Sequence, residues 1–160
     1  MDKGLLHKQI IELLDSVYQG AVDAAMLAYN TATHEENVAE NKYDTLGLEA
    51  SYLAQGQAQR VEECKADLAA FKALEPIEFS DPLRITIGAL IVLLDDQSVE
   101  QYLFLGPAAG GVKFIYSDIE ITVITPSAPL GQALLGHFVD DEISIDIADQ
   151  KLTYEIIAIY

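Results

Sequence analysis

The residues with the clearest chemical potential lie in the stretch 33–44, THEENVAENKYD, which holds four carboxylates and one lysine. The carboxylates are Glu35, Glu36, Glu40 and Asp44. Mg²⁺ in proteins takes oxygen ligands and few protein contacts, so carboxylates grouped on a projecting turn are suited to hold it. The alternative is a solvated polar turn, because runs of charged residues usually face water. The residue types alone leave both interpretations open.

The composition limits what this acidic stretch is attached to. The chain has 160 residues, 51% of them hydrophobic, which suffices for the core of one large domain or two small ones. Its net charge of -17, from 9 basic and 26 acidic residues, argues against strong autonomous binding to nucleic acid and favours a protein or a cation as partner. One cysteine, no apolar run long enough for a membrane span and no signal-peptide pattern predict a cytoplasmic protein without a membrane role.

Two segments with a helical period flank the acidic stretch. Apolar or small residues recur at alternating spacings of four and three on both sides. The upstream series is Ile10, Leu14, Val17, Ala21, Ala24 and Ala28, and the downstream series is Gly47, Ala50, Ala54, Gln57, Val61, Cys64, Leu68 and Phe71. Small residues lie nearest the acidic stretch in both series, so only antiparallel pairing sets small against small. The pattern predicts an antiparallel coiled-coil hairpin over residues 1–75, close-packed near an acidic tip at 33–44.

Three residues of this hairpin receive structural interpretations. Cys64 falls on the predicted seam, where a buried thiol is the ordinary role. His7 and His34 are isolated and lack the spacing of metal ligands, so both are expected to be ordinary surface residues. Six basic and thirteen acidic residues up to Glu75 leave little basic surface that would contact RNA.

The second half of the chain changes to strand-like patterns. The segment 76–82 contains two prolines and is interpreted as a linker, because proline interrupts helices. From 83 to 160, short β-rich runs are separated by turn signals, and one helix is expected with Pro129 in its first turn and Gly136 at its end. The runs are RITI, ALIVLL, VEQYLFL, VKFIY, IEITVIT, EISIDI and LTYEIIAIY. The predicted fold class is α+β, with the helical hairpin followed by a small antiparallel sheet and one helix.

The run APLGQALLGHFVDDEISI at 128–145, with YEIIAI near the end, resembles the C-terminal signature of the bacterial Gre transcript-cleavage factors, GreA and GreB. That signature is a Ser-Pro-apolar-Gly-x-Ala-apolar-apolar-Gly helix that leads into an acidic turn and a strand. The matching residues are Pro129, Leu130, Gly131, Ala133, Leu134, Leu135, Gly136, Val139, Asp141 and Ile143, while Ala128 and Asp140 replace the usual serine and glycine. AENKY at 39–43 is similar to the Ser-Glu-Asn-Ala-Glu-Tyr segment at the Gre coiled-coil tip, with one residue fewer before the tyrosine.

The resemblance implies a transcription elongation factor that binds bacterial RNA polymerase. In that family an FKBP-like C-terminal domain binds at the rim of the secondary channel, and the coiled coil reaches down the channel to the active site. Tip carboxylates there help to hold a Mg²⁺ ion shared with the polymerase, which cleaves the 3′ end of backtracked nascent RNA. The protein would thus be a cofactor of polymerase cleavage rather than an independent enzyme.

Carried onto this chain, the resemblance implies a docking region and a metal-binding tip. The docking residues are Pro129, Leu130, Gly131, Leu134 and Gly136. The catalytic, metal-binding pair is Glu36 and Glu40, which lie four residues apart, so one turn of chain can bring both to one side. The other tip residues are Glu35, Asn37, Asn41, Tyr43 and Asp44.

One departure from the family pattern leaves other functions open. The family pairs an aspartate with a glutamate three residues later, and aligning that glutamate with Glu40 puts Asn37 at the aspartate position. An amide is a neutral and weaker ligand. Either Glu36 takes the role, or the protein enters the channel without stimulating cleavage and regulates or inhibits the polymerase. A prolyl isomerase is a third alternative, but it needs a deep aromatic-lined pocket, and the aromatic residues here fall within strands.

Overall fold

The computed structural model describes residues 2–34, 46–75, 84–148 and 150–160 of the chain. The chain divides into two compact units. One is the hairpin segment Gln9–Ala69, and the other joins Met1–Lys8 with Ala70–Tyr160. The linker predicted at 76–82 lies outside the described residues. The start of the first hairpin helix and the end of the second thus belong to the same compact unit as the C-terminal sheet.

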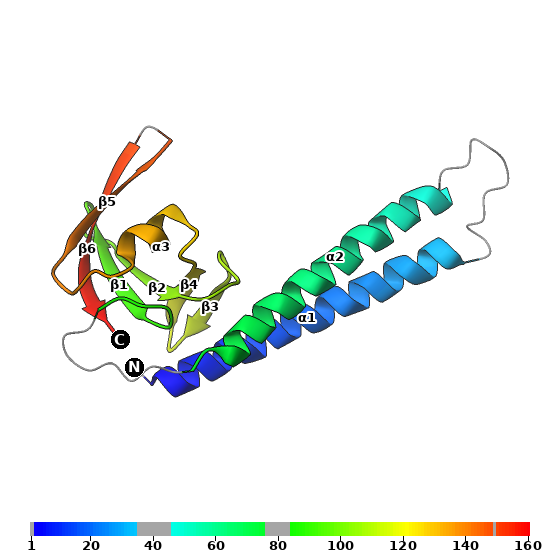
Figure 1. Ribbon diagram of the computed structural model, residues 1–160, viewed down its shortest axis with the longest axis horizontal. Coiled ribbons are helices and arrows are strands. Elements are labelled where there is room, and N and C mark those ends of the chain that lie inside the picture. The colour runs from blue at the N-terminus through cyan, green and yellow to red at the C-terminus, as the bar shows by residue number, and fades with distance from the viewer. Residues whose placement is uncertain (1, 35–45, 76–83, 149) are drawn as a thin grey trace. The chain divides into compact units, whose positions relative to one another are not determined.

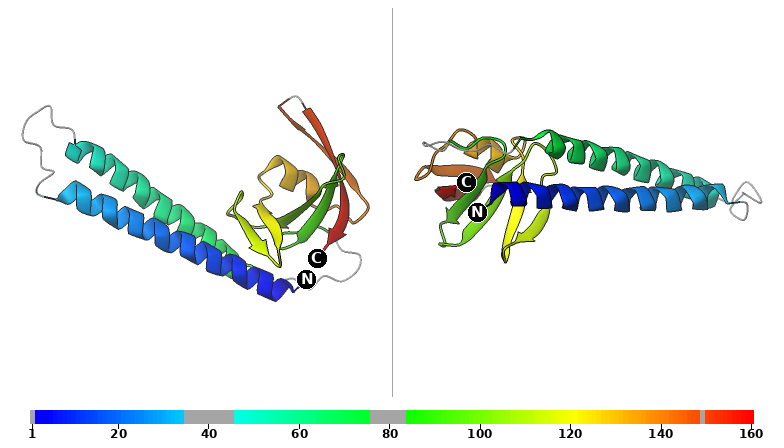
Figure 2. Two further views of the ribbon diagram at one scale, coloured as in Figure 1. Left: turned by 180° about the vertical axis from the view of Figure 1, so that it is seen from behind. Right: turned by 90° about the horizontal axis from the view of Figure 1, so that it is seen from below.

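Two long helices form the hairpin. They are α1 at Lys3–Thr33 and α2 at Leu46–Ala73, and they lie side by side and run in opposite directions (Figure 1, Figure 2). The carboxylate of Asp2 caps the start of α1, because its Oδ1 accepts a hydrogen bond of 3.0 Å from the N–H of Leu5. The predicted antiparallel hairpin is confirmed.

Most residues that are buried in the hairpin belong to the series with alternating spacings of four and three. The buried members are Leu6, Ile10, Leu14, Ala21 and Ala28 on α1 and Ala50, Cys64, Leu68 and Phe71 on α2. Leu6 was not part of the predicted series. Within that series Val17 is 37% exposed, and Ala24, Ala54, Gln57 and Val61 are half-buried. Each helix thus buries a single stripe.

None of the helices in the described ranges is long and apolar enough to cross a membrane.

The outer half of the hairpin, defined as residues 24–33 of α1 and 48–57 of α2, buries Ala28 and Ala50 but is not completely filled by side chains. An open groove of about 280 Å³ lies there, and Ala24, Ala28 and Ala50 contribute to its lining. A methyl group extends only one carbon from the backbone, so small residues on both helices leave the space between them unfilled.

The C-terminal unit is built on a sheet whose six described strands have the order β3-β4-β2-β1-β6-β5 (Figure 1). The strands are β1 Leu90–Asp95, β2 Glu100–Leu105, β3 Lys113–Tyr116, β4 Ile119–Ile124, β5 Glu142–Ile147 and β6 Gln150–Ile159, and the helix α3 is Pro129–Leu134. The main core cluster joins Leu134 of α3 to Leu103 of β2 and Ile145 of β5. The predicted α+β class, a hairpin followed by a sheet with one helix, is confirmed.

Two details of the sheet differ from the sequence prediction. β2 and β4 run parallel, with Tyr102 opposite Ile121, whereas the other neighbouring strands pair antiparallel. The chain leaves β2, forms the outer strand β3 and returns as β4 between β3 and β2, so β4 takes the direction of β2. RITI at 84–87 is not a strand, although Ile85 is completely buried. Its backbone instead bonds to the loop after α3.

His7 is not an ordinary surface residue, contrary to the prediction. Its Nε2 lies 2.9 Å from the carbonyl oxygen of Phe71, and the two rings stack with centroids 6.5 Å apart. Phe71 is completely buried, and its ring lies 6.0 Å from that of Phe104 in β2. A Cβ at Gly106 would lie 2.6 Å from Phe71 Cζ, so glycine leaves the room that this ring occupies. His7 and Phe71 are 64 residues apart, which is beyond what local spacing can indicate.

We expect two alanines of the α1 seam to respond differently to a larger side chain. Ala21→Leu enlarges a buried position and should lower the free energy of unfolding by about 1–3 kcal/mol. Ala24→Leu should cost less than about 1 kcal/mol, because the added carbons can enter the groove. Thermal or urea unfolding of both variants measures the difference. Equal losses of stability would contradict an open groove in solution.

Candidate docking surface and acidic turn

The predicted metal-binding pair and the other tip residues lie outside the described residues. These are Glu36 and Glu40, together with Glu35, Asn37, Asn41, Tyr43 and Asp44. Their assignment therefore stays a prediction. In the ranges that the structure does describe, no three His, Cys, Asp or Glu side chains are grouped so that they could hold a metal ion.

The helix α3 is positioned by contacts between main chains. Pro129 lies in its first turn, where its fixed φ suits the helix and its missing N–H costs nothing. A Cβ at Gly131 would collide with the backbone carbonyl of Thr125, so only glycine lets the helix lie this close to the chain that leaves β4. Gly136 has a φ of +88°, the left-handed conformation that ends helices and favours glycine. Gly131 thus allows the close packing of α3, and Gly136 allows the turn at its end.

The loop at 135–141, called the docking loop below, is tied to the segment that precedes β1. The N–H of Gly136 donates to the carbonyl of Ile85, and the N–H of Ile85 donates to the carbonyl of His137, both at 2.9 Å. A Cβ at Gly136 would lie 3.0 Å from the guanidinium of Arg84. The Arg84 side chain therefore lies against the turn at Gly136. The docking loop therefore has a defined backbone although much of it is exposed.

Asp141 organises the docking loop through its carboxylate. Its Oδ2 accepts a hydrogen bond of 2.9 Å from the N–H of Phe138 and lies 2.9 Å from Nδ1 of His137. Its backbone oxygen accepts a hydrogen bond from the N–H of Ile156 in β6. Hydrogen bonds to the ionised form favour it, so the bond from Phe138, followed by that from His137, lowers the pKa of Asp141 below its ordinary value.

The docking loop presents apolar side chains that the sequence reasoning missed. Leu135, Phe138 and Val139 are 46%, 39% and 37% exposed. Of the predicted docking residues, Pro129 is exposed, Leu130 and Gly136 are half-buried, and Gly131 and Leu134 are buried. The buried pair supports the surface from below, while the exposed residues can touch a partner. The available signal was an apolar Phe-Val pair that begins two residues after a helix-ending glycine.

The sheet also carries a hollow of about 430 Å³, but its lining is polar. Glu100, Lys113, Asp118 and Glu120 contribute to it, and Tyr102 is its one aromatic residue. The Lys113 Nζ lies 2.8 Å from Glu120 Oε1, and the Tyr102 hydroxyl donates to Glu100 Oε2 at 2.7 Å. That hydrogen bond raises the pKa of Tyr102. A pocket for prolyl peptides needs aromatic walls, so this hollow does not favour isomerase activity.

Acid should weaken the protein through Asp141. Because its pKa is lower in the folded protein than its ordinary 3.8, the carboxylate adds stability above pH 3.8, and this contribution is lost as the pH falls through the folded pKa. Asp141→Asn keeps an acceptor for the N–H of Phe138 but removes the charge, so its stability should fall less steeply below pH 3.8. Urea unfolding over an acid series compares it with wild type and with Asp146→Asn, an exposed aspartate of β5. If the free energy of unfolding falls equally with acid in all three proteins, Asp141 does not have the lowered pKa.

Residues 81–160 match the family model described as Transcription elongation factor, GreA/GreB, C-term. The chain is 29% identical to the transcription elongation factor GreA of Desulfovibrio desulfuricans over 140 residues, and this aligned region covers 82% of this chain and 76% of that protein. It is 26% identical to GreA of Thermodesulfovibrio yellowstonii over 155 residues, and this aligned region covers 96% of this chain and 91% of that protein. Among solved structures, GreA factor homolog 1 (Gfh1) of Thermus thermophilus is similar, with 21% identity, 94% of both chains covered and a TM-score of 0.40. Because the family model spans half of the chain and includes α3 and the docking loop, the chain belongs to the GreA/GreB family of transcription elongation factors.

Proposed function

We propose that this protein binds bacterial RNA polymerase, inserts its hairpin into the secondary channel and stimulates cleavage of the 3′ end of backtracked RNA. One observation carries the proposal: a GreA/GreB C-terminal domain follows a two-helix hairpin whose connecting stretch, 33–44, holds four carboxylates. α1 has 31 residues and so extends about 45 Å at 1.5 Å per residue. A stiff arm of that length supports a factor that brings ligands to another enzyme's active site.

Docking on the polymerase is assigned to the docking loop and the exposed start of α3. Leu135, Phe138 and Val139 offer an apolar surface whose backbone is already held by Ile85 and by the carboxylate of Asp141. A surface that is ordered before binding loses less conformational entropy when the partner arrives. Apolar contacts are also screened little by salt, in contrast to contacts between exposed charges.

The acidic tip is the proposed site of the Mg²⁺ ion that cleavage requires. Glu36 and Glu40 fit that ion chemically, because carboxylate oxygens are its preferred ligands. An ion held there beside the metal of the polymerase would activate a water molecule and stabilise negative charge on the scissile phosphate. The part of this chain is to hold and orient the ion from a rigid arm, so both carboxylates must be ionised.

A non-cleaving regulator of the polymerase is the second candidate function. Asn37 favours it, since it occupies the position where the resemblance to the Gre tip calls for an aspartate. A neutral amide binds Mg²⁺ more weakly than a carboxylate does. If Glu36 does not replace the missing acid, the same arm in the same channel would obstruct synthesis without promoting cleavage.

Replacing apolar side chains of the docking loop should weaken polymerase binding. The double variant Phe138→Ser, Val139→Ser removes two exposed apolar groups, and we expect about a tenfold or greater rise in Kd for polymerase core enzyme. Ile147→Ser, an equally exposed apolar residue of β5, is the matched control. Unchanged affinity of the double variant with a normal thermal transition would place docking elsewhere.

Exchanges at the tip separate cleavage from binding. Glu40→Gln keeps the shape of the side chain but removes the charge that attracts Mg²⁺, so cleavage of backtracked RNA should fall by orders of magnitude while Kd for the polymerase changes little. Asn37→Asp adds an acid at the family position and should raise cleavage, or create it if the natural protein lacks it. The readout is RNA length after incubation of a stalled, backtracked complex in Mg²⁺.

The same assay distinguishes the two candidate functions. If wild type and Asn37→Asp both leave backtracked RNA intact while they still inhibit synthesis, the cleavage function is wrong and the regulator is the better account. Glu49→Gln, in the first turn of α2, serves as a control for the loss of one nearby acid.

A further inference from the structure

The strand β5 forms one edge of the sheet (Figure 1). Its six residues pair with β6 on one side, and no strand lies on its other side in the described part of the chain. Such an edge offers unpaired N–H and C=O groups to an added strand. The opposite edge is less suitable, because β3 has four residues and its Tyr116 hydroxyl bonds to the carbonyl of Asp2.

The pairing with β6 shows which main-chain groups of β5 point outward. In antiparallel pairs, positions that exchange hydrogen bonds alternate with positions that do not. Ile156 is a bonded position, because its N–H donates to the carbonyl of Asp141 at 2.9 Å and its own carbonyl accepts from the N–H of Asp140 at 2.8 Å. Counted from there, alternate residues of β5 turn their N–H and C=O groups away from β6. These residues are Glu142, Ser144 and Asp146.

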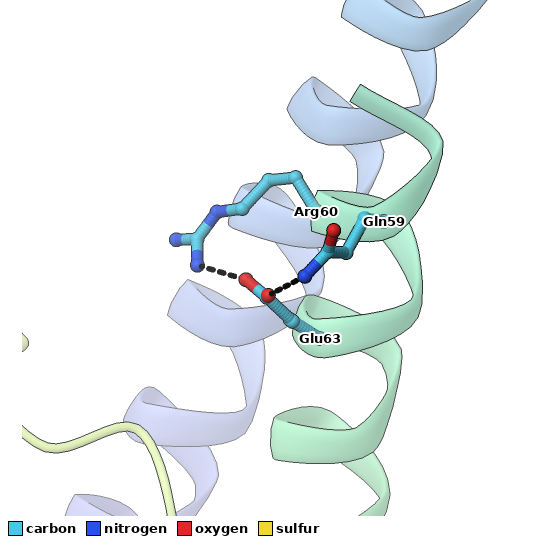
Figure 3. Close-up of polar contacts among 3 residues, drawn as sticks. All are labelled: Gln59, Arg60 and Glu63. Carbon is cyan, nitrogen blue, oxygen red and sulfur yellow. Dashed lines mark hydrogen bonds and ion pairs between the residues drawn. The ribbon is translucent and has the colours of Figure 1, made fainter. Parts of the chain in front are cut away.

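Two like charges meet beside this edge. Glu142 lies directly opposite Glu155 of β6, both residues are exposed, and neither forms an ion pair within the described ranges. Like charges in opposite positions destabilise a sheet. The exposed carboxylate of Glu63 is different, because it is paired with Arg60 at 3.4 Å and bonded to Gln59 at 3.2 Å (Figure 3). A cation beside Glu142 would therefore offset a repulsion that the ladder leaves in place.

The alternation of side chains defines what an added strand must carry. Glu142, Ser144 and Asp146 share one face of the sheet, and the residues opposite them in an added antiparallel strand share that face too. Lysine or arginine at those positions would meet Glu142 and Asp146. The intervening residues fall on the other face, where Ile147 is 46% exposed and an apolar side chain can cover it. The fitting segment alternates basic and apolar residues.

Two other occupants fit this edge poorly. If a second copy paired antiparallel about Ser144, Glu142 of each copy would lie opposite Asp146 of the other, so like charges would meet at both ends. Nucleic acid is disfavoured because its phosphates need cationic partners, and the outward-facing residues of β5 carry two carboxylates.

We propose that the free edge of β5 binds an extended segment of another protein, in which basic and apolar residues alternate, as an added antiparallel strand. The outward N–H and C=O groups of β5 supply the hydrogen bonds, and Glu142 selects a basic residue opposite it. The inference goes beyond the proposed function and does not depend on it, because it uses β5 and not the side chains of the docking loop.

The test adds a capped octapeptide of four Lys-Val repeats to the full chain. In the added strand the lysine N–H groups bond to β5 and the valine N–H groups point away. Methylation of the four lysine backbone nitrogens should therefore raise Kd at least about tenfold, relative to methylation of the four valine nitrogens. NMR titration of the labelled protein measures both. At saturation, the unmethylated peptide should slow hydrogen exchange of the Ser144 and Asp146 amides.

A charge exchange tests the role of Glu142. Glu142→Lys should weaken binding of the Lys-Val peptide and strengthen binding of a Glu-Val peptide of equal length, each by about fivefold or more. Glu62→Lys makes the same change at an exposed glutamate of α2 and should leave both affinities as in wild type. Circular dichroism checks that the variants fold, and the methylated peptides decide the question on wild type if Glu142→Lys does not.

Other outcomes overturn the inference. If the unmethylated peptide does not bind, or if the two methylated peptides bind equally, no strand is added to β5. Equal binding of the Lys-Val and Glu-Val peptides to wild type would remove the selection by charge. Slower exchange at β3 would assign the opposite edge. Slower exchange of the Ser144 and Asp146 amides at rising protein concentration without peptide would assign the edge to a second copy.

Discussion

The close approach of Gly131 to the carbonyl of Thr125 is the contact on which the C-terminal surface depends. It lets α3 lie against the chain that leaves β4, and Leu134 then reaches the core with no exposed surface. The helix ends at Gly136, where the backbone meets Ile85 and turns outward. Any side chain at Gly131 would move α3 as a body, because a backbone carbonyl cannot rotate away as a side chain can. The docking loop would move with it.

A different constraint governs the hairpin. Two helices can bury only one stripe each, so most of their surface meets whatever surrounds them. Near the polar cluster of Gln59, Arg60 and Glu63 the exposed faces are suited to water. In the outer half, exposed apolar side chains such as Leu27 and Leu53 lie among exposed polar ones. Burial inside the hairpin does not require that change, since the buried stripe is apolar throughout.

The features that sequence could predict are those set by neighbours in the chain. Alternating spacings of four and three located the buried stripes and Cys64, and the Pro129 and Gly136 signals located α3. Features set by distant parts of the chain escaped prediction. The contact of His7 with Phe71 joins residues 64 positions apart, and the parallel pairing of β2 with β4 depends on the path around β3. The turn at Phe138 escaped prediction for another reason: its N–H bonds to Asp141, only three residues on, in a loop that has neither a helical nor a strand period.

Electrostatics explains why apolar surfaces suit the proposed role. In that role, a chain with a net charge of -17 would bring four tip carboxylates toward a catalytic centre that contains RNA phosphates. Like charges repel at that distance, and only the bound cations offset the repulsion. The free energy of association must then come from elsewhere. Apolar contact at the docking loop can supply it without adding positive charge, which would bind RNA indiscriminately. In the same role, a neutral Asn37 would lower the repulsion further, at the cost of a weaker metal ligand.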